Sequence, residues 1–175
     1  ESAGSPVTVS RGIALYVTNL GVMVAVEART GRVRWLVRYR QWPSPVDQDI
    51  LPKPRRRSWD INPILVQGTQ VFSAPTDSPF LFARDLDTGA PSWQLRQTAA
   101  KSCATLLGVT TQSLLVTRAD GVVALDPATG RQSWTWRPTG GDGVVGRGAV
   151  TRDGILVPTR LGLQRLAPDG TLRVT

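Results

Sequence analysis

Apolar residues alternate with polar ones along most of the chain, in short runs separated by glycine and acidic residues. The segments 13–18, 21–26, 70–74, 113–117 and 121–125 show this spacing of two. A period of two is typical of strands with one buried face, whereas an amphipathic helix repeats every 3.6 residues. No window of ten or more residues carries a persuasive helical stripe. The pattern therefore predicts an all-β protein.

The predicted strands belong to a repeat that is marked by three copies of one frame. The frame reads A-x-[D/E]-x-x-T-G-x-x-x-W, and its copies end at Trp35, Trp93 and Trp134. A fourth copy over 164–174 keeps its glycine, Gly170, but lacks the alanine, the acid and the tryptophan. The glycine-to-glycine steps are 58, 41 and 40 residues. They indicate a period of about 40 residues with one insertion of about 17.

Each period holds four strand-like runs, which predicts a four-stranded antiparallel meander. Sheets of this kind, repeated along a chain, are the blades of a β-propeller. We expect one propeller domain or fragment over 1–175, with blades at about 6–39, 60–97, 102–137 and 143–175.

Each residue type in the frame has a predicted local role. The acid can accept N–H groups of the following turn, and the glycine supplies a positive φ. The tryptophan can bury on the order of 200 Å² against the neighbouring sheet. The acids are Glu27, Asp85 and Asp126, and the glycines are Gly31, Gly89 and Gly130.

This frame resembles the tryptophan-docking motif of the quinoprotein-type (PQQ-like) β-propeller repeats, and the resemblance covers essentially the whole chain. It implies that Trp35, Trp93 and Trp134 pack blade against blade and are not ligand platforms. Known relatives include quinone-dependent alcohol dehydrogenases and a non-catalytic propeller lipoprotein that helps assemble outer-membrane proteins. The resemblance alone implies a location in the periplasm or cell envelope.

Family members usually have seven or eight blades, so four blades leave three arrangements open. The chain is a fragment of a larger ring, half of a ring completed by a second copy, or a closed four-bladed ring. Exposed end blades would present sticky edges. We therefore expect a protein partner, a second copy or further residues to complete the propeller.

Composition limits the chemistry that the chain can perform. The absence of His excludes Ser-His-Asp and Cys-His catalysis, and the single Cys103 excludes an internal disulfide and a Cys-based zinc site. The quinone-dependent relatives carry adjacent cysteines, which one Cys cannot provide, and their calcium ligands and catalytic Asp find no matching positions. We therefore expect a non-catalytic scaffold or protein-interaction module with no cofactor and no metal. The alternative is a fragment of a quinone-dependent dehydrogenase.

Net charge suggests the kind of partner. With 21 Lys and Arg against 13 Asp and Glu, the chain carries a formal charge of +8. Such an excess favours anionic partners such as nucleic acid, lipid headgroups or an acidic protein face. A basic module that binds polyanions without specificity is a further alternative, but we expect no specific nucleic acid. The apolar runs are too short for a transmembrane helix.

The Pro/Arg-rich insertion over 40–60 is the candidate interaction loop. It contains four prolines and two tryptophans, and loops of this length in compact domains are usually functional or disordered. One interpretation is a docking loop in which the aromatic residues are anchors and the arginines contact anions. The other is a solvated loop held in place by one tryptophan. The residues concerned are Trp42, Arg55, Arg56, Arg57 and Trp59.

Overall fold

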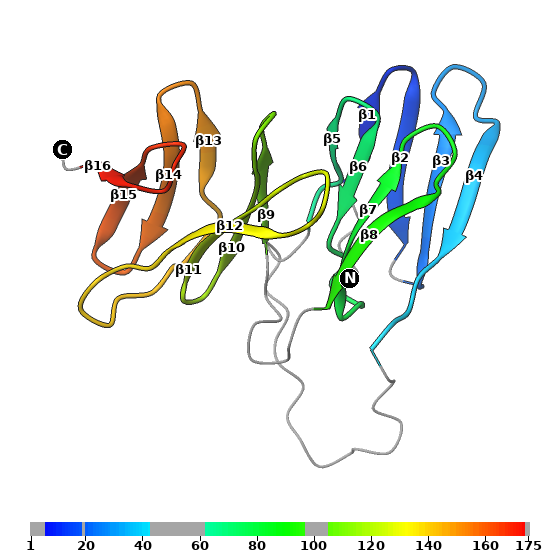
Figure 1. Ribbon diagram of the computed structural model, residues 1–175. Coiled ribbons are helices and arrows are strands. Elements are labelled where there is room, and N and C mark those ends of the chain that lie inside the picture. The colour runs from blue at the N-terminus through cyan, green and yellow to red at the C-terminus, as the bar shows by residue number, and fades with distance from the viewer. Residues whose placement is uncertain (1–5, 19, 43–61, 97–104, 174–175) are drawn as a thin grey trace, which may run out of the picture.

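The protein is a row of four β-sheets, seen in a computed structural model that describes residues 6–18, 20–42, 62–96 and 105–173 (Figure 1). Each sheet has four strands, and strands that are consecutive in the chain pair antiparallel. We call each of these sheets a blade. The architecture confirms the prediction of an all-β propeller-type fold built from four four-stranded blades.

The strands of each blade follow one another in chain order. Blade 1 contains β1 (Thr8–Ser10), β2 (Ile13–Thr18), β3 (Val22–Glu27) and β4 (Val33–Arg38). Blade 2 contains β5 (Leu65–Gln67), β6 (Gln70–Ser73), β7 (Phe80–Asp85) and β8 (Pro91–Arg96). Blade 3 contains β9 (Thr105–Val109), β10 (Leu114–Arg118), β11 (Gly121–Leu125) and β12 (Gln132–Trp136). Blade 4 contains β13 (Ala149–Thr151), β14 (Gly154–Thr159), β15 (Gly162–Leu166) and β16 (Leu172–Arg173).

The core lies between blades and not within them. Successive residues of a strand point to opposite faces of its sheet. In β7, Phe82 packs toward blade 1, while its neighbour Leu81 packs toward blade 3. Blade 3 likewise packs Val123 toward blade 2 and Val122 toward blade 4. Three apolar clusters therefore occupy the three spaces between the four sheets, and each cluster belongs to two blades.

Hydrogen bonds also connect the blades along the edge formed by their first strands. The Thr8 hydroxyl donates to the Ile64 carbonyl over 2.7 Å, which links blade 1 to the start of blade 2. The Leu106 N–H donates to Asn62 Oδ1 over 2.9 Å. Arg147 Nη2 donates to the Leu106 carbonyl over 3.1 Å. These bonds connect neighbouring sheets in addition to their apolar contacts.

The row of blades is open. Blade 1 and blade 4 lie at its opposite ends, with blades 2 and 3 between them (Figure 1). The closed four-bladed ring that the repeat count left open is therefore wrong for this structure. Among the described residues, each end blade has one face with no further blade against it (Figure 1).

Phe72 tests the importance of the inter-blade core. This ring is 0% exposed and packs against Trp93 with centroids 6.0 Å apart. We expect Phe72→Ala to lower the free energy of unfolding by about 3–5 kcal/mol, because it leaves a cavity between two blades. Leu20→Ala serves as the control, since Leu20 is 80% exposed, and should change it by less than about 0.5 kcal/mol. Equal denaturant midpoints for the two variants would contradict an inter-blade core.

Candidate functional site

The candidate site is the contact that each tryptophan of the frame makes with the next blade. Trp35, on β4 of blade 1, is 7% exposed and reaches the β7–β8 turn of blade 2. Its Nε1–H donates to the Leu86 carbonyl over 2.9 Å. A Cβ atom placed on Gly89 would lie 2.7 Å from Cδ2 of this indole. The indole therefore lies directly on the glycine, where no other residue would fit.

The same contact recurs twice further along the row. Trp93 Nε1–H donates to the Pro127 carbonyl over 2.8 Å, and a Cβ on Gly130 would lie 2.7 Å from this indole. The indole of Trp134 would lie 2.6 Å from a Cβ on Gly170, although the fourth repeat departs from the frame. Gly89 and Gly130 both have a φ of +71°, which L side chains adopt only with strain. Backbone conformation and close approach together require glycine.

The alanine of the frame lies directly opposite the tryptophan on the neighbouring strand. The register pairs Ala25 with Trp35, and the equivalent pairs occur in blades 2 and 3. In all three blades the alanine is 0% exposed, and the register shifts by one residue immediately after it. A shift of this kind re-aims the adjacent side chains. A small residue beside a bulge thus leaves room for the indole on the face that meets the next blade.

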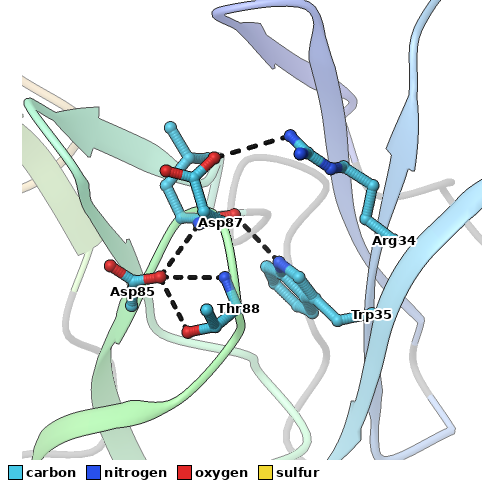
Figure 2. Close-up of polar contacts among 6 residues, drawn as sticks. Arg34, Trp35, Asp85, Asp87 and Thr88 are labelled. Carbon is cyan, nitrogen blue, oxygen red and sulfur yellow. Dashed lines mark hydrogen bonds and ion pairs between the residues drawn. The ribbon is translucent and has the colours of Figure 1, made fainter.

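The acid of the frame closes the turn on which the indole lies. Asp85 Oδ1 accepts the Thr88 hydroxyl over 2.7 Å and the N–H groups of Thr88 and Asp87 over 2.8 and 3.1 Å (Figure 2). These bonds, led by the Thr88 hydroxyl, lower the pKa of Asp85 below its ordinary value. Asp126 accepts two turn N–H groups in the same way. In blade 1, Glu27 accepts the Thr30 hydroxyl over 2.6 Å.

One ion pair crosses from blade 1 to blade 2 beside Trp35. Arg34 Nη1 lies 3.5 Å from Asp87 Oδ1, and both side chains are nearly half exposed (Figure 2). Exposed pairs of this kind contribute about 1 kcal/mol or less. The pair therefore matters for charge matching between neighbouring blades more than for stability.

A buried carboxylate that the sequence analysis missed links blade 1 to blade 2. Asp77 is 8% exposed and follows β6. Its oxygens accept hydrogen bonds from the Tyr39 hydroxyl (2.8 Å), Gln41 Nε2 (2.9 Å) and the Gly21 N–H (3.2 Å). Burial, followed by the bond to Asp77, raises the pKa of Tyr39 well above its ordinary value. The local sequence signal was an acid between Pro75 and Pro79, which does not indicate the partners of Asp77.

Of the five residues singled out in the candidate interaction loop, Trp42 is the one that the structure describes. It is partly buried, and its backbone N–H donates to the Asp77 carbonyl over 2.8 Å. Arg55, Arg56, Arg57 and Trp59 lie outside the described residues. The loop therefore remains a prediction, although its first residues are anchored on blade 2.

An open groove of about 540 Å³ lies beside the ion pair. It is lined by residues of blade 1 together with Asp87 of blade 2. Three arginines and two acids contribute to its wall: Arg11, Arg32, Arg34, Glu27 and Asp87. The mixed charges favour polar contacts and do not define a catalytic pair.

The turn of blade 1 is built like the occupied turns of blades 2 and 3, but no indole of the described residues lies on it. Gly31 has a φ of +72°, and nothing lies within 4 Å of a Cβ placed on it. Ala28 holds the position, three residues before the glycine, at which Leu86 and Pro127 accept the indole N–H. Leu86 and Pro127 are buried, whereas Ala28 is exposed. We call Ala28 to Gly31 the vacant turn.

The residues present do not fit the calcium and quinone site that the resemblance to the dehydrogenases implies. The chain has no His and one Cys, and Cys103 lies outside the described residues. Within the described ranges, no group of three or more Cys, Asp or Glu side chains is arranged to hold a metal ion. We therefore derive no step through such a group.

The described part of the chain also contains no helix that is long and apolar enough to cross a membrane.

A family model described as outer membrane protein assembly factor BamB matches residues 1–135. The chain belongs to this BamB family. Solved structures agree on the fold. The crystal structure of BamB from Moraxella catarrhalis has a TM-score of 0.66 at 23% identity, over 95% of this chain and 51% of that one. None of the curated proteins matches this BamB-family chain significantly.

Two further structures resemble the chain in fold. Quinohemoprotein alcohol dehydrogenase from Comamonas testosteroni has a TM-score of 0.67 at 16% identity, over 99% of this chain and 34% of that one. The computationally designed Ika4 protein has a TM-score of 0.62 at 17% identity, over 100% of this chain and 93% of that one. The chain thus spans about half the length of the BamB structure and a third of the dehydrogenase.

Glycine substitutions separate an occupied turn from the vacant turn of this BamB-family chain. Gly31→Ala should cost only the strain of a positive φ, about 1–2 kcal/mol. Gly89→Ala carries the same strain and must also displace Trp35, so it should cost at least about 1 kcal/mol more. Denaturant unfolding followed by circular dichroism measures both. Equal losses in the free energy of unfolding for the two variants would show that packing of the Trp35 indole does not require this glycine.

Acid should weaken the fold through the turn carboxylates. Hydrogen bonds lower the folded-state pKa values of three carboxylates. The leading donors are the Thr88 hydroxyl to Asp85, the Thr159 hydroxyl to Asp142 and the Thr171 N–H to Asp169. A carboxylate whose pKa is lowered on folding stabilises the fold above its unfolded pKa of about 4, and this contribution is lost as the pH falls through the folded value. We expect the melting temperature to fall from pH 5 to pH 2. The variant in which all three aspartates are replaced by Asn should show a smaller fall in melting temperature over this range. A fall as large as that of the unsubstituted chain would contradict this interpretation.

Proposed function

We propose that this BamB-family chain is a non-catalytic scaffold that binds a protein partner through the open face of blade 1. The observation that carries the proposal is the vacant turn. Gly31 keeps the positive φ of the occupied turns, and the Ala28 position is exposed where its equivalents are buried. A partner that supplies an indole there would repeat the contact that three tryptophans make inside the chain.

The apolar character of the open face of blade 1 supports the same proposal. Val9, Tyr16, Val33 and Leu36 are 63, 38, 55 and 56% exposed. Val116 of blade 3 is the equivalent of Tyr16, because each pairs with the residue that immediately precedes the alanine of the frame. Val116 is 2% exposed, because blade 2 covers it. Blade 1 therefore carries a face of the kind that a further blade covers elsewhere in the row.

The proposal assigns the frame residues a structural role. Trp35, Trp93 and Trp134 dock on the glycines of the following blades and fix the spacing of the row, and Asp85 and Asp126 hold the turns. The chain forms one propeller domain or fragment over 1–175. The loop containing Trp42 and Trp59 is a second contact region in this proposal.

A location in the cell envelope belongs to the same proposal. Its support is the family description, which names a factor in outer-membrane protein assembly. The periplasm is the compartment in which such a scaffold would meet unfinished envelope proteins.

Photo-crosslinking in cells tests the partner at the open face of blade 1. A benzophenone amino acid at Leu36, which is 56% exposed on this face, should give adducts with a protein of the envelope fraction. Gly31→Asn should reduce these adducts at least about fivefold, because Asn tolerates a positive φ while its side chain fills the vacant turn.

Gly140→Asn is the matched control for that experiment. Gly140, which lies between blades 3 and 4, has a φ of +69°, and nothing lies within 4 Å of a Cβ placed on it, so the substitution introduces the same backbone change away from blade 1. Adducts should persist in this variant. Equal adducts in both variants, or none in the unsubstituted chain, would reject the proposed partner site.

The competing proposal is a fragment of a quinone-dependent dehydrogenase, which the fold similarity to the Comamonas testosteroni enzyme favours. It is tested directly by incubating the chain with pyrroloquinoline quinone and calcium and measuring reduction of a dye by alcohols. Alcohol-dependent dye reduction above the protein-free rate would replace the scaffold proposal.

A further inference from the structure

The last blade breaks the alanine–tryptophan pairing in a specific way. Its register pairs Arg165 with Arg173 and Leu166 with Leu172. In the earlier blades, the register shifts by one residue immediately after the paired alanine. The pairs of blade 4 show no such shift. The sequence frame, counted from Gly170, would place Val174 at the tryptophan position.

A shorter turn explains why Arg165, and not Gln164, holds the alanine position. The Ala167 N–H donates to the Thr171 carbonyl over 2.8 Å, whereas the equivalent bond in blade 2 runs from the Asp85 N–H to the Ala90 carbonyl. The loop closed in blade 4 is thus one residue shorter. Arg165 consequently holds the position of the frame alanine. Arg173 pairs directly with it, because no register shift separates this pair from Leu166 and Leu172.

Both arginines lie on the outward face of blade 4. Leu166 and Ile155 pack toward blade 3 and are 0 and 2% exposed. Because successive residues point to opposite faces, Arg165 lies on the other face, as does its partner Arg173. Leu163, which is 62% exposed, shares that face.

Arg165 Nη2 donates to the Asp153 carbonyl over 3.2 Å, and Asp169 is the acid that interacts with Arg173. Two like charges directly opposite each other on paired strands repel, and one acid does not balance two arginines, so this face favours contact with further negative charge.

The vacant turn of blade 1 does not offer that charge. Asp87, which lies two residues before Gly89, pairs with Arg34 of the preceding blade. Arg29 holds the same position before Gly31, and Arg32 follows that glycine. Glu27, which immediately precedes this turn, accepts a hydrogen bond from the Thr30 hydroxyl. A second copy docked end to end would therefore bring Arg165 and Arg173 toward Arg29 and Arg32, and it would bring no indole.

We propose that the outward face of blade 4 binds an acidic protein surface and not blade 1 of a second copy. Carboxylates of that partner pair with Arg165 and Arg173, as Asp87 pairs with Arg34, around an apolar contact with Leu163. The inference rests on the proposed function, in which the open ends of the row are docking faces. It adds that the two ends recognise different chemistry.

Charge exchange within the chain tests this proposal without an unidentified partner. The probe is the chain's own blade 1 carrying Arg29→Asp and Arg32→Asp, which places a carboxylate where Asp87 lies in blade 2. Light scattering should give 18.9 kDa for the unsubstituted chain and about 38 kDa, or a higher multiple, for this variant. The association should weaken at least about tenfold between about 50 and 500 mM salt, since exposed charges are screened.

The reverse exchange completes the test and serves as its matched control. Arg165→Glu/Arg173→Glu, with Arg29 and Arg32 retained, should associate to the same extent. All four substitutions together should return the chain to 18.9 kDa, because both faces then carry negative charge. Circular dichroism and melting temperature establish that each variant is folded.

Three results would overturn the proposal. An unsubstituted chain that already has a mass of about 38 kDa, unaffected by either exchange, makes a second copy the occupant. Exchanges that leave the mass at 18.9 kDa show that charge does not decide docking. Loss of heparin binding in Arg165→Glu/Arg173→Glu without any self-association assigns the face to a polyanion. None of these measurements involves an indole or the benzophenone adducts. A negative result for blade 4 can therefore be told apart from a negative result for the partner site on blade 1.

Discussion

The fold depends on one repeated contact, an indole ring lying on a glycine of the neighbouring sheet. At Trp35 and Trp93 the contact combines a large buried apolar ring, a hydrogen bond to a backbone carbonyl and a glycine that no other residue can replace without strain or overlap. The indole N–H finds an acceptor, so burial of the ring leaves no unpaired donor. The alanine opposite and the carboxylate in the turn both prepare the geometry for this contact.

The sequence predicted the parts of the structure that are encoded locally. Strand spacing indicated sixteen short strands in four sheets, and the positions of Gly89 and Gly130 follow from the turn chemistry of the frame. The Asp77 cluster was not predictable in the same way. Tyr39, Gln41 and Gly21 come together around Asp77 only after blade 2 has packed on blade 1, and no local pattern records that contact.

Blade 4 shows a second limit of sequence patterns. Counting from Gly170 assigned Gln164 to the alanine position, but the turn from Ala167 to Thr171 is one residue shorter than its equivalents, so Arg165 holds that position. A one-residue shift in a strand exchanges the two faces of the sheet. Whether an arginine or an aliphatic side chain faces outward was therefore decided by turn length, which a gapless motif does not encode. The loop residues Arg55, Arg56, Arg57 and Trp59 stay predictions because they lie outside the described residues.

Because every apolar cluster is shared by two sheets, no blade carries the whole of its own stabilisation. The stability of such an array is approximately the sum of the stability of each blade and of the interfaces between neighbouring blades. Blades 2 and 3 are each supported on both faces, whereas blades 1 and 4 are each supported on one. Backbone amide protons of blades 1 and 4 should accordingly exchange with solvent most readily. A molecule that covers an end should slow this exchange, first in the covered blade and then in the blades toward the middle of the row.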